Sequence, residues 1–145
     1  AKIYYAVTEG VPIPDGNAGG LIQWHENASG GFVINAPIGR AGESIIRREV
    51  RSDGQRAVTN YTIVKENDSY CLVRVLLETG RTHQIRVHFS SVGHPLAGDD
   101  FYGGSMNLCE TQALHCGEMT FRRISDGKEI AVSCPIRDDM MAAFL

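Results

Sequence analysis

The residues best suited to chemistry lie between Glu78 and Pro95, in the segment ETGRTHQIRVHFSSVGHP. No acidic residue occurs across residues 79–98, although the chain has 17 acidic and 14 basic side chains and a formal charge of −3. The same window holds Arg81, Arg86 and three of the five histidines. The sequence therefore predicts a local positive field, suited to a carboxylate or a phosphate, on an acidic protein.

Two elements must position these side chains. Residues 70–77, YCLVRVLL, form an apolar run that predicts a β-strand. After the glycine at position 80, apolar residues recur at the spacing of one buried helical face, at Ile85, Phe89 and Val92. We therefore expect a strand, a glycine turn and a short helix, with Thr79 or Thr82 as the helix cap.

Arg86 is expected at the edge of the buried helical face, about 100° from Ile85. Packing can hold a guanidinium there while it still presents its fork to an anion. The alternative is that Arg81 and Arg86 are solvated surface arginines, whose exposed ion pairs contribute little. The residue types alone leave both interpretations open.

A metal site is the obvious alternative use of the histidines, and their spacing argues against it. Ligands on one helix face lie three or four residues apart. His83 and His88 are five apart, about 140° from each other around a helix, and His94 lies beyond its expected end. We predict no metal and no cofactor.

The segment GRTHQIRVH, followed by GHPLAGDDFYGG, resembles the third conserved motif of RNA pseudouridine synthases of the RluA/RluD type. Other segments resemble further landmarks of that family in the same order: Lys2–Val7 (KIYYAV), Ala36–Arg40 (APIGR), Gly54–Thr59 (GQRAVT), Ala113–Cys116 (ALHC) and Cys134–Ile136 (CPI). The resemblance spans nearly the whole chain. It implies an isomerase that converts uridine to pseudouridine in ribosomal or transfer RNA.

The resemblance also implies roles for individual residues. Tyr4 would stack under the uracil, and Arg86 would pair with the nucleophilic aspartate of the family. Ile85 would wall the pocket, and Leu114 and His115 would support the sheet beneath it. Arg81 and His83 would contact RNA phosphates.

The nucleophilic aspartate itself lies in an H-R-L-D segment upstream of the first strand, and no such segment occurs in these residues. We therefore expect a C-terminal portion of the catalytic domain, inactive alone. A noncatalytic RNA-binding module is the alternative. A self-sufficient enzyme that uses Asp99 ranks last, because the motif gives Asp99 and Asp100 turn and capping roles.

Length and composition predict one domain over residues 1–145, without a signal peptide or membrane-length apolar run, and hence a cytoplasmic protein. The four cysteines show no metal spacing and are expected to be reduced thiols, mostly buried. The acidic balance argues against tight nonspecific RNA binding. A second mild basic patch is expected at Arg40, Arg47, Arg48, Arg51 and Arg56.

The remaining chain predicts an α+β fold with a mixed, mostly antiparallel sheet and few helices. Strands are expected over residues 2–9, 32–38, 45–51, 57–65, 113–122 and 128–134, and a short helix over 138–145. Tyr4 and Tyr5 would lie on opposite faces of the first strand. Residues 10–31 are expected to be loop, and Trp24 is given no role beyond packing.

Overall fold

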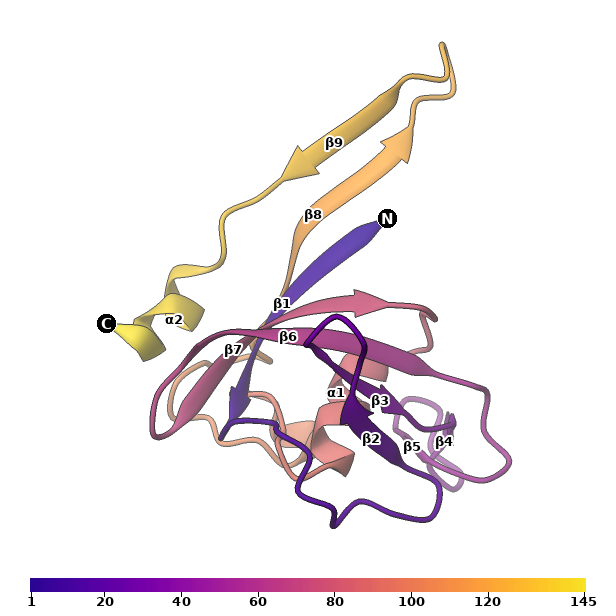
Figure 1. Cartoon of the computed structure of the whole chain (residues 1–145), viewed down its shortest axis with the longest axis vertical. Coiled ribbons are helices and arrows are strands. Elements are labelled where there is room, and N and C mark those ends of the chain that lie inside the picture. Colours follow the sequence, from indigo (N-terminus) through magenta and orange to yellow (C-terminus); the bar gives the residue numbers. More distant parts are fainter.

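A computed structural model describes residues 1–145. A seven-stranded sheet runs through it, and Figure 1 shows its arrangement. The strands are β1 (Lys2–Glu9), β2 (Gln23–Glu26), β3 (Phe32–Asn35), β4 (Ile38–Arg40), β5 (Arg48–Val50), β6 (Val58–Glu66), β7 (Tyr70–Leu77), β8 (Leu114–Arg122) and β9 (Glu129–Ser133). The helices are α1 (Gln84–Ser91), α2 (Asp138–Met141) and the 3-10 turns η1 (Asp100–Tyr102) and η2 (Ala142–Phe144).

Strand order in the sheet is β2-β3-β6-β7-β1-β8-β9, while β4 and β5 form a separate two-stranded sheet. Every strand pairing is antiparallel. With few helices, this confirms the predicted α+β class. The centre of the sheet is β1, which pairs with β7 on one side and β8 on the other.

The two faces of the sheet have separate cores, because successive side chains of a strand point to opposite faces. Tyr4 packs against the core that contains Ile85 and Phe89 of α1, whereas Tyr5 packs against the core that contains Met140 of α2. Ile85 and Phe89 both belong to the predicted helical face. The structure places α1 on the Tyr4 side of β1.

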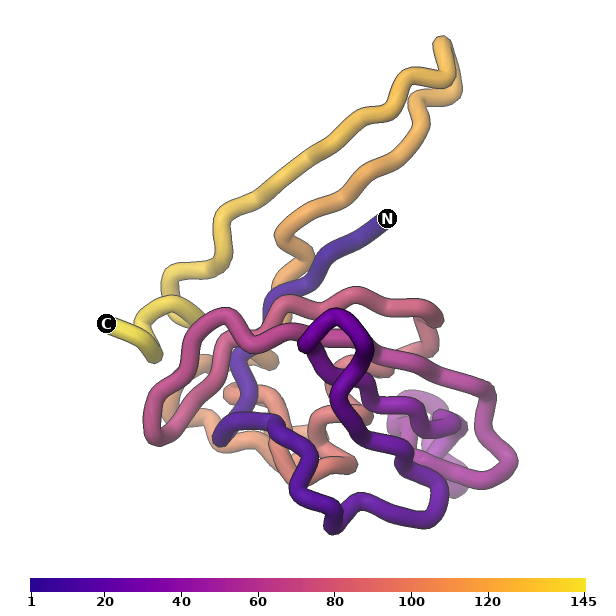
Figure 2. The backbone as a smooth tube through the Cα atoms, viewed as in Figure 1, coloured from indigo at the N-terminus to yellow at the C-terminus, as the bar shows by residue number.

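A long hairpin of β8 and β9 projects away from the rest of the molecule, with the first residues of β1 beside its base (Figures 1 and 2). Most side chains in the part of the hairpin that extends past the end of β1 are exposed. Its length follows from regular pairing between Glu118 and Ser133 at one end and Arg122 and Glu129 at the other.

The expected strand over residues 32–38 is interrupted, which corrects that prediction. Pro37 lacks an N–H and cannot continue the ladder, so β3 ends at Asn35 and β4 begins at Ile38. The strand expected over residues 45–51 is restricted to β5, because Ile45 and Ile46 project into solvent instead of pairing.

The expected loop over residues 10–31 contains an additional strand, β2, which extends the sheet beyond β3. Trp24 of β2 donates from Nε1 to Tyr61 Oη at 2.8 Å, and Tyr61 Oη donates to the Pro12 carbonyl at 2.6 Å. Trp24 is therefore a packing residue that joins β2 to the core. No helix is long and apolar enough to cross a membrane.

Candidate active site

A pocket of about 360 Å³ opens between the start of α1 and the central strands. It is lined by Tyr4, Leu77, Gly80, Arg81, His83, Gln84, Ile85, Arg86, Gln112 and Leu114. All six residues predicted for catalysis or substrate binding are in this set. The fold brings them together from β1, the turn after β7, α1 and β8, although Tyr4 and Leu114 are 110 positions apart.

The turn before α1 is held by the side chain of Gln84, which sequence reasoning overlooked. Its Oε1 accepts from the Arg81 amide at 3.0 Å and from Thr79 Oγ1 at 2.7 Å, while its Nε2 donates to the Val58 carbonyl at 3.0 Å. Gln84 is 2% exposed. These bonds fasten the turn to β6 and fix where α1 begins.

Neither Thr79 nor Thr82 caps α1, which corrects that expectation. The N-cap residue is His83, in the left-handed region at φ 56°, with no side-chain cap bond. Thr79 Oγ1 is occupied elsewhere, accepting from the Val58 amide at 3.0 Å. The strained His83 backbone turns its imidazole toward Tyr102, with 2.6 Å between Nδ1 and Oη.

Burial lowers the pKa of His83, with smaller contributions from the positive charges of Arg86 and Arg48. The neutral form of the imidazole is therefore favoured. Tyr102 Oη accepts from the Arg48 amide at 3.1 Å, so its own proton is available to His83 Nδ1. This arrangement leaves the His83 Nε2–H as a free donor.

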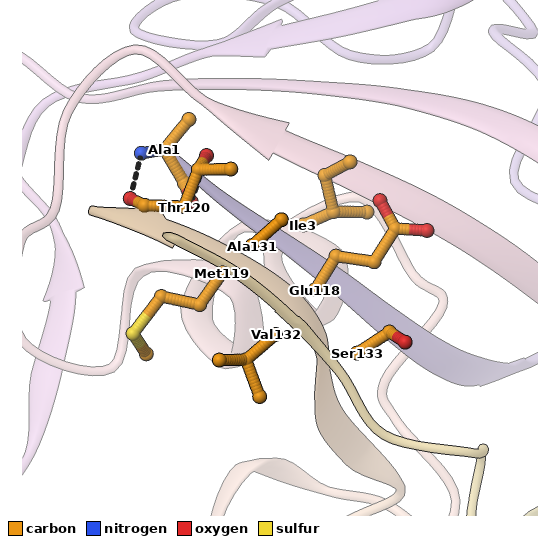
Figure 3. Close-up of a pocket in the computed structure, with 8 residues that line it drawn as sticks. All are labelled: Ala1, Ile3, Glu118, Met119, Thr120, Ala131, Val132 and Ser133. Carbon is orange, nitrogen blue, oxygen red and sulfur yellow. Dashed lines mark hydrogen bonds between the residues drawn. The ribbon is translucent and has the colours of Figure 1, made fainter. Parts of the chain in front are cut away.

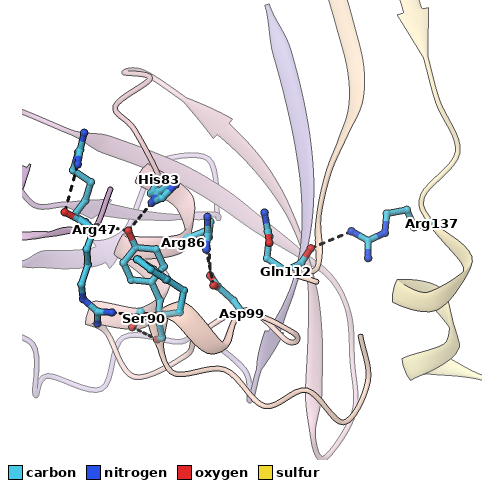
Figure 4. Close-up of polar contacts among 10 residues, drawn as sticks. Arg47, His83, Arg86, Ser90, Asp99, Gln112 and Arg137 are labelled. Atoms are coloured by element: carbon cyan, nitrogen blue, oxygen red, sulfur yellow. Dashed lines mark hydrogen bonds and ion pairs between the residues drawn. The ribbon is translucent and has the colours of Figure 1, made fainter. Parts of the chain in front are cut away.

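Arg86 is held by a carboxylate within the chain, that of Asp99 (Figure 4). Its Nε donates to Asp99 Oδ2 at 3.0 Å and its Nη2 to Oδ1 at 2.9 Å, while Nη1 makes no hydrogen bond. Asp99 is 1% exposed and the Arg86 side chain 14%. The hydrogen bonds to Asp99 raise the pKa of Arg86.

Two aromatic rings pack near the guanidinium group of Arg86. Its guanidinium carbon lies 4.9 Å from the ring centre of Tyr102 and 5.9 Å from that of Phe101. Arg47 approaches the same two rings, at 5.2 Å from each. Cation–π attraction therefore adds to the ion pair in fixing Arg86.

Asp99, expected in a turn or capping role, occupies the N-cap position of η1, but its side chain bonds to Arg86. The loop that carries it is folded tightly, because a Cβ at Gly98 would collide with the Thr111 carbonyl and one at Gly104 with the Leu96 carbonyl. These close approaches place the Asp99 side chain next to α1. Its side chain does not cap η1.

Tyr4 provides the aromatic surface of the pocket. Its ring packs against the core on the α1 side, and its hydroxyl makes no hydrogen bond within the chain. Leu77, Ile85 and Leu114 supply apolar walls around it. His115, the next residue of β8, points to the other side and is only half-buried, bonded through Nε2 to the Cys134 carbonyl at 3.2 Å.

A second hollow of about 260 Å³ adjoins the pocket and shares Arg81 with it. Arg40 and Arg48 also line this hollow, next to the glycine backbone of β4. Arg51 is paired with Asp53 and Glu49, so its charge is compensated. Of the five arginines expected in a basic patch, Arg40 and Arg48 thus contribute most directly to this hollow.

The other histidines of the central segment have structural roles. His88 is fully buried, with Nδ1 2.8 Å from Thr59 Oγ1 and Nε2 2.8 Å from the Ala36 carbonyl. Burial lowers its pKa to about 4. His94 Nδ1 lies 2.9 Å from the Glu9 carbonyl. No group of three or more histidine, cysteine or acidic side chains is arranged to hold a metal ion.

The cysteines are all free, as expected, but only two of the four are buried. Cys71 and Cys109 lie in the two cores, while Cys134 is exposed.

A further hollow of about 180 Å³ lies where β1 meets the projecting hairpin (Figure 3). Its lining is largely aliphatic, with Glu118 as its one charged side chain. It lacks the convergent polar groups of the Arg86 pocket. The Arg86 pocket is therefore the candidate active site.

Comparison with known proteins agrees with this geometry. Residues 1–91 match the family model described as RNA pseudouridylate synthase. The chain is 46% identical over 107 residues to the Bacillus subtilis protein named uncharacterized RNA pseudouridine synthase YjbO, covering 74% of this chain and 38% of that protein. It is 39% identical over 119 residues to ribosomal large subunit pseudouridine synthase D of Nitrosomonas europaea, covering 76% and 35%.

Among solved structures, human RNA pseudouridylate synthase domain containing 1 superposes with a TM-score of 0.67 at 22% identity, covering 92% of this chain and 54% of the other. That similarity shows the shared fold. The chain spans less than two fifths of the length of the bacterial relatives. On the family match and the sequence identities, the chain belongs to the RNA pseudouridylate synthase family, of the RluA/RluD type.

Proposed function

We propose that the chain is the C-terminal portion of the catalytic domain of an enzyme that isomerises uridine to pseudouridine in ribosomal or transfer RNA. The observation that carries this proposal is one pocket that combines the aromatic ring of Tyr4, apolar walls and a rigidly held Arg86. An unpaired base needs a flat surface to stack on, and a reacting carboxylate needs a fixed cation beside it.

The reaction breaks the bond between uracil N1 and the sugar, rotates the uracil and joins C5 to the same carbon. C5 loses a proton and N1 gains one, so nothing is oxidised and no group is carried in. Tyr4 would hold the detached uracil, with its free hydroxyl near C5 as the proton acceptor. Ile85 and Leu114 would exclude water from the detached base.

The nucleophilic carboxylate would come from the family's H-R-L-D segment, which is not among these 145 residues. Arg86 retains Nη1 for that carboxylate, since Asp99 engages only Nε and Nη2. A positive charge beside it would keep the carboxylate ionised and fix its orientation.

Phosphates of the RNA would lie along the rim, where Arg81 connects the pocket to the second hollow. Arg40 and Arg48 would extend this contact, and the His83 Nε2–H would donate without carrying a charge. A local basic surface of this kind attracts RNA even on a chain of net charge −3.

A self-sufficient enzyme using Asp99 is disfavoured by burial rather than by distance. Asp99 lies within hydrogen-bonding distance of Arg86, but both its oxygens are engaged and it is absent from the pocket lining. A uridine in the pocket would reach Arg86 before it reached Asp99.

The test is release of tritium from RNA labelled at uridine C5, measured for this chain and for a longer form that carries the H-R-L-D segment. The proposal expects release by the longer form alone, and its loss in the longer form with Arg86→Ala. Arg123→Ala, in an exposed ion pair of the projecting hairpin, is the matched control and should leave release unchanged.

Binding of RNA without release by the longer form would instead indicate a noncatalytic module. Release by the 145 residues alone, abolished by Asp99→Asn, would indicate the Asp99 enzyme. Full activity of Arg86→Ala would remove Arg86 from the mechanism.

A further inference from the structure

We infer that Gln112 binds the Watson–Crick edge of the uracil in the Arg86 pocket, an inference that rests on the proposed function. Gln112 lines the pocket immediately before β8. Its side-chain amide makes no hydrogen bond within the chain, so one acceptor and two donors are free. Figure 4 shows it on the side of β8 that faces Arg86.

Most of the other polar side chains of the pocket have hydrogen-bond partners within the chain. Gln84 is bonded within the turn before α1 and to β6, and two of the three guanidinium nitrogens of Arg86 are bonded to Asp99. Arg81 Nε donates to the Arg56 carbonyl at 2.9 Å, and His83 Nδ1 lies 2.6 Å from Tyr102 Oη. Gln112 is therefore the one pocket side chain with a wholly free amide, which offers a donor and an acceptor side by side.

The backbone of Gln112 is held firmly. Its carbonyl accepts from Arg137 Nη1 at 3.0 Å, and Arg137 is itself paired with Asp139. The next residue, Ala113, is fully buried and donates to the Ala97 carbonyl at 2.8 Å while accepting from the Val7 amide at 3.0 Å. A free amide on a backbone held at these points is suited to recognition, because little order must be created on binding.

The chemistry of the two groups is complementary. A uracil presents an N3–H between two carbonyls, and an amide presents a carbonyl beside an NH₂. Oε1 can accept from N3–H while Nε2 donates to the adjacent uracil carbonyl, in the paired geometry by which amide side chains read base edges. The second uracil carbonyl then lies free for a further donor.

The test uses the ¹⁵N-labelled chain titrated with uridine 5′-monophosphate and, separately, with its N3-methyl analogue, followed by NMR. Methylation removes the N3–H and blocks the edge. The inference expects the Gln112 side-chain NH₂ signal, assigned by its absence in Gln112→Leu, to shift with the unmodified nucleotide. The N3-methyl nucleotide should bind about tenfold more weakly, as expected for two neutral hydrogen bonds.

In Gln112→Leu the unmodified nucleotide should lose about tenfold in affinity, and the preference over the methylated one should largely vanish. Gln23→Leu, on the exposed strand β2, is the matched control and should bind like the unaltered chain. A dispersed spectrum verifies the fold of each variant.

Shifts at Tyr4 and Arg86 with no change at Gln112, or an unchanged preference in Gln112→Leu, would overturn the inference and leave the proposed function intact. An absence of shifts at every pocket residue would also overturn it, because Gln112 would then have no base to bind. Tritium release by the longer form decides the proposed function independently.

Discussion

Separating Arg86 from Asp99 is expected to destabilise the fold as well as the site. The pair is bidentate, at 3.0 and 2.9 Å, and Asp99 is 1% exposed. Removing one member of a buried pair costs about 3–5 kcal/mol, because the other charge stays buried without compensation. The two single substitutions should not be equivalent, since the partners differ in their access to water.

In Asp99→Ala, Arg86 keeps the Tyr102 ring at 4.9 Å and is 14% exposed, so water can reach it. We expect a loss near the lower end of that range, about 3 kcal/mol. In Arg86→Met the stranded carboxylate has no such access, and the loss should approach about 4 kcal/mol. The double variant leaves no buried charge, so its loss should be about 2 kcal/mol or less, far below the sum of the singles.

The assay is urea unfolding of the unaltered chain, the two single variants and the double variant at pH 7, followed by circular dichroism. Arg123→Ala removes an exposed pair and should change the free energy of unfolding by less than about 0.5 kcal/mol. If the two single losses add to within about 0.5 kcal/mol in the double variant, the two side chains do not interact in solution as described. The reasoning about Arg86 positioning would then be refuted.

Two further predictions concern the supports of the site. His88 has a pKa of about 4 instead of the ordinary 6.5, so the unfolded chain takes up a proton below pH 6.5 that the folded chain resists. The stability that neutral His88 contributes is present above pH 6.5 and is lost as the pH falls toward 4. The loss should be about 3 kcal/mol, at about 1.4 kcal/mol per pKa unit. Urea unfolding midpoints measured from pH 8 to 4 should show this decline, and an equal decline in His88→Gln would contradict it. Gly103→Ala should lower the free energy of unfolding by roughly 1 kcal/mol, the strain of a left-handed alanine. Gly98→Ala should lower it by well over that amount, because only a Cβ at position 98 collides with backbone atoms. Equal melting temperatures for the two variants would contradict the tight loop.

The local patterns were informative wherever a residue's neighbours in sequence determine its environment. The spacing of Ile85, Phe89 and Val92 predicted the buried face of α1, and alternation placed Tyr4 and Tyr5 on opposite faces of β1. These results follow from the periods of helix and strand, which need no tertiary information. Motif resemblance then indicated which of these residues share one pocket.

Errors occurred where a local signal competed with a distant partner. Thr79 is a good capping residue by type, yet its hydroxyl bonds to β6 and Gln84. Residues 10–31 are rich in turn formers, but Trp24 forms part of a strand because Ile34 and Tyr61 offer it a partner strand and a hydrogen bond.

The sequence by itself determined the family, the strands and helix that carry the site, and the identity of Tyr4, Ile85, Arg86 and Leu114 as neighbours. Only the tertiary structure decided that Asp99 holds Arg86 and that Gln112 keeps a free amide in the pocket. Both depend on close backbone approaches between distant segments, at Gly98 against Thr111 and at Ala113 between Val7 and Ala97. Such contacts are set by the packing of the whole chain and leave no periodic signal in the residues that make them.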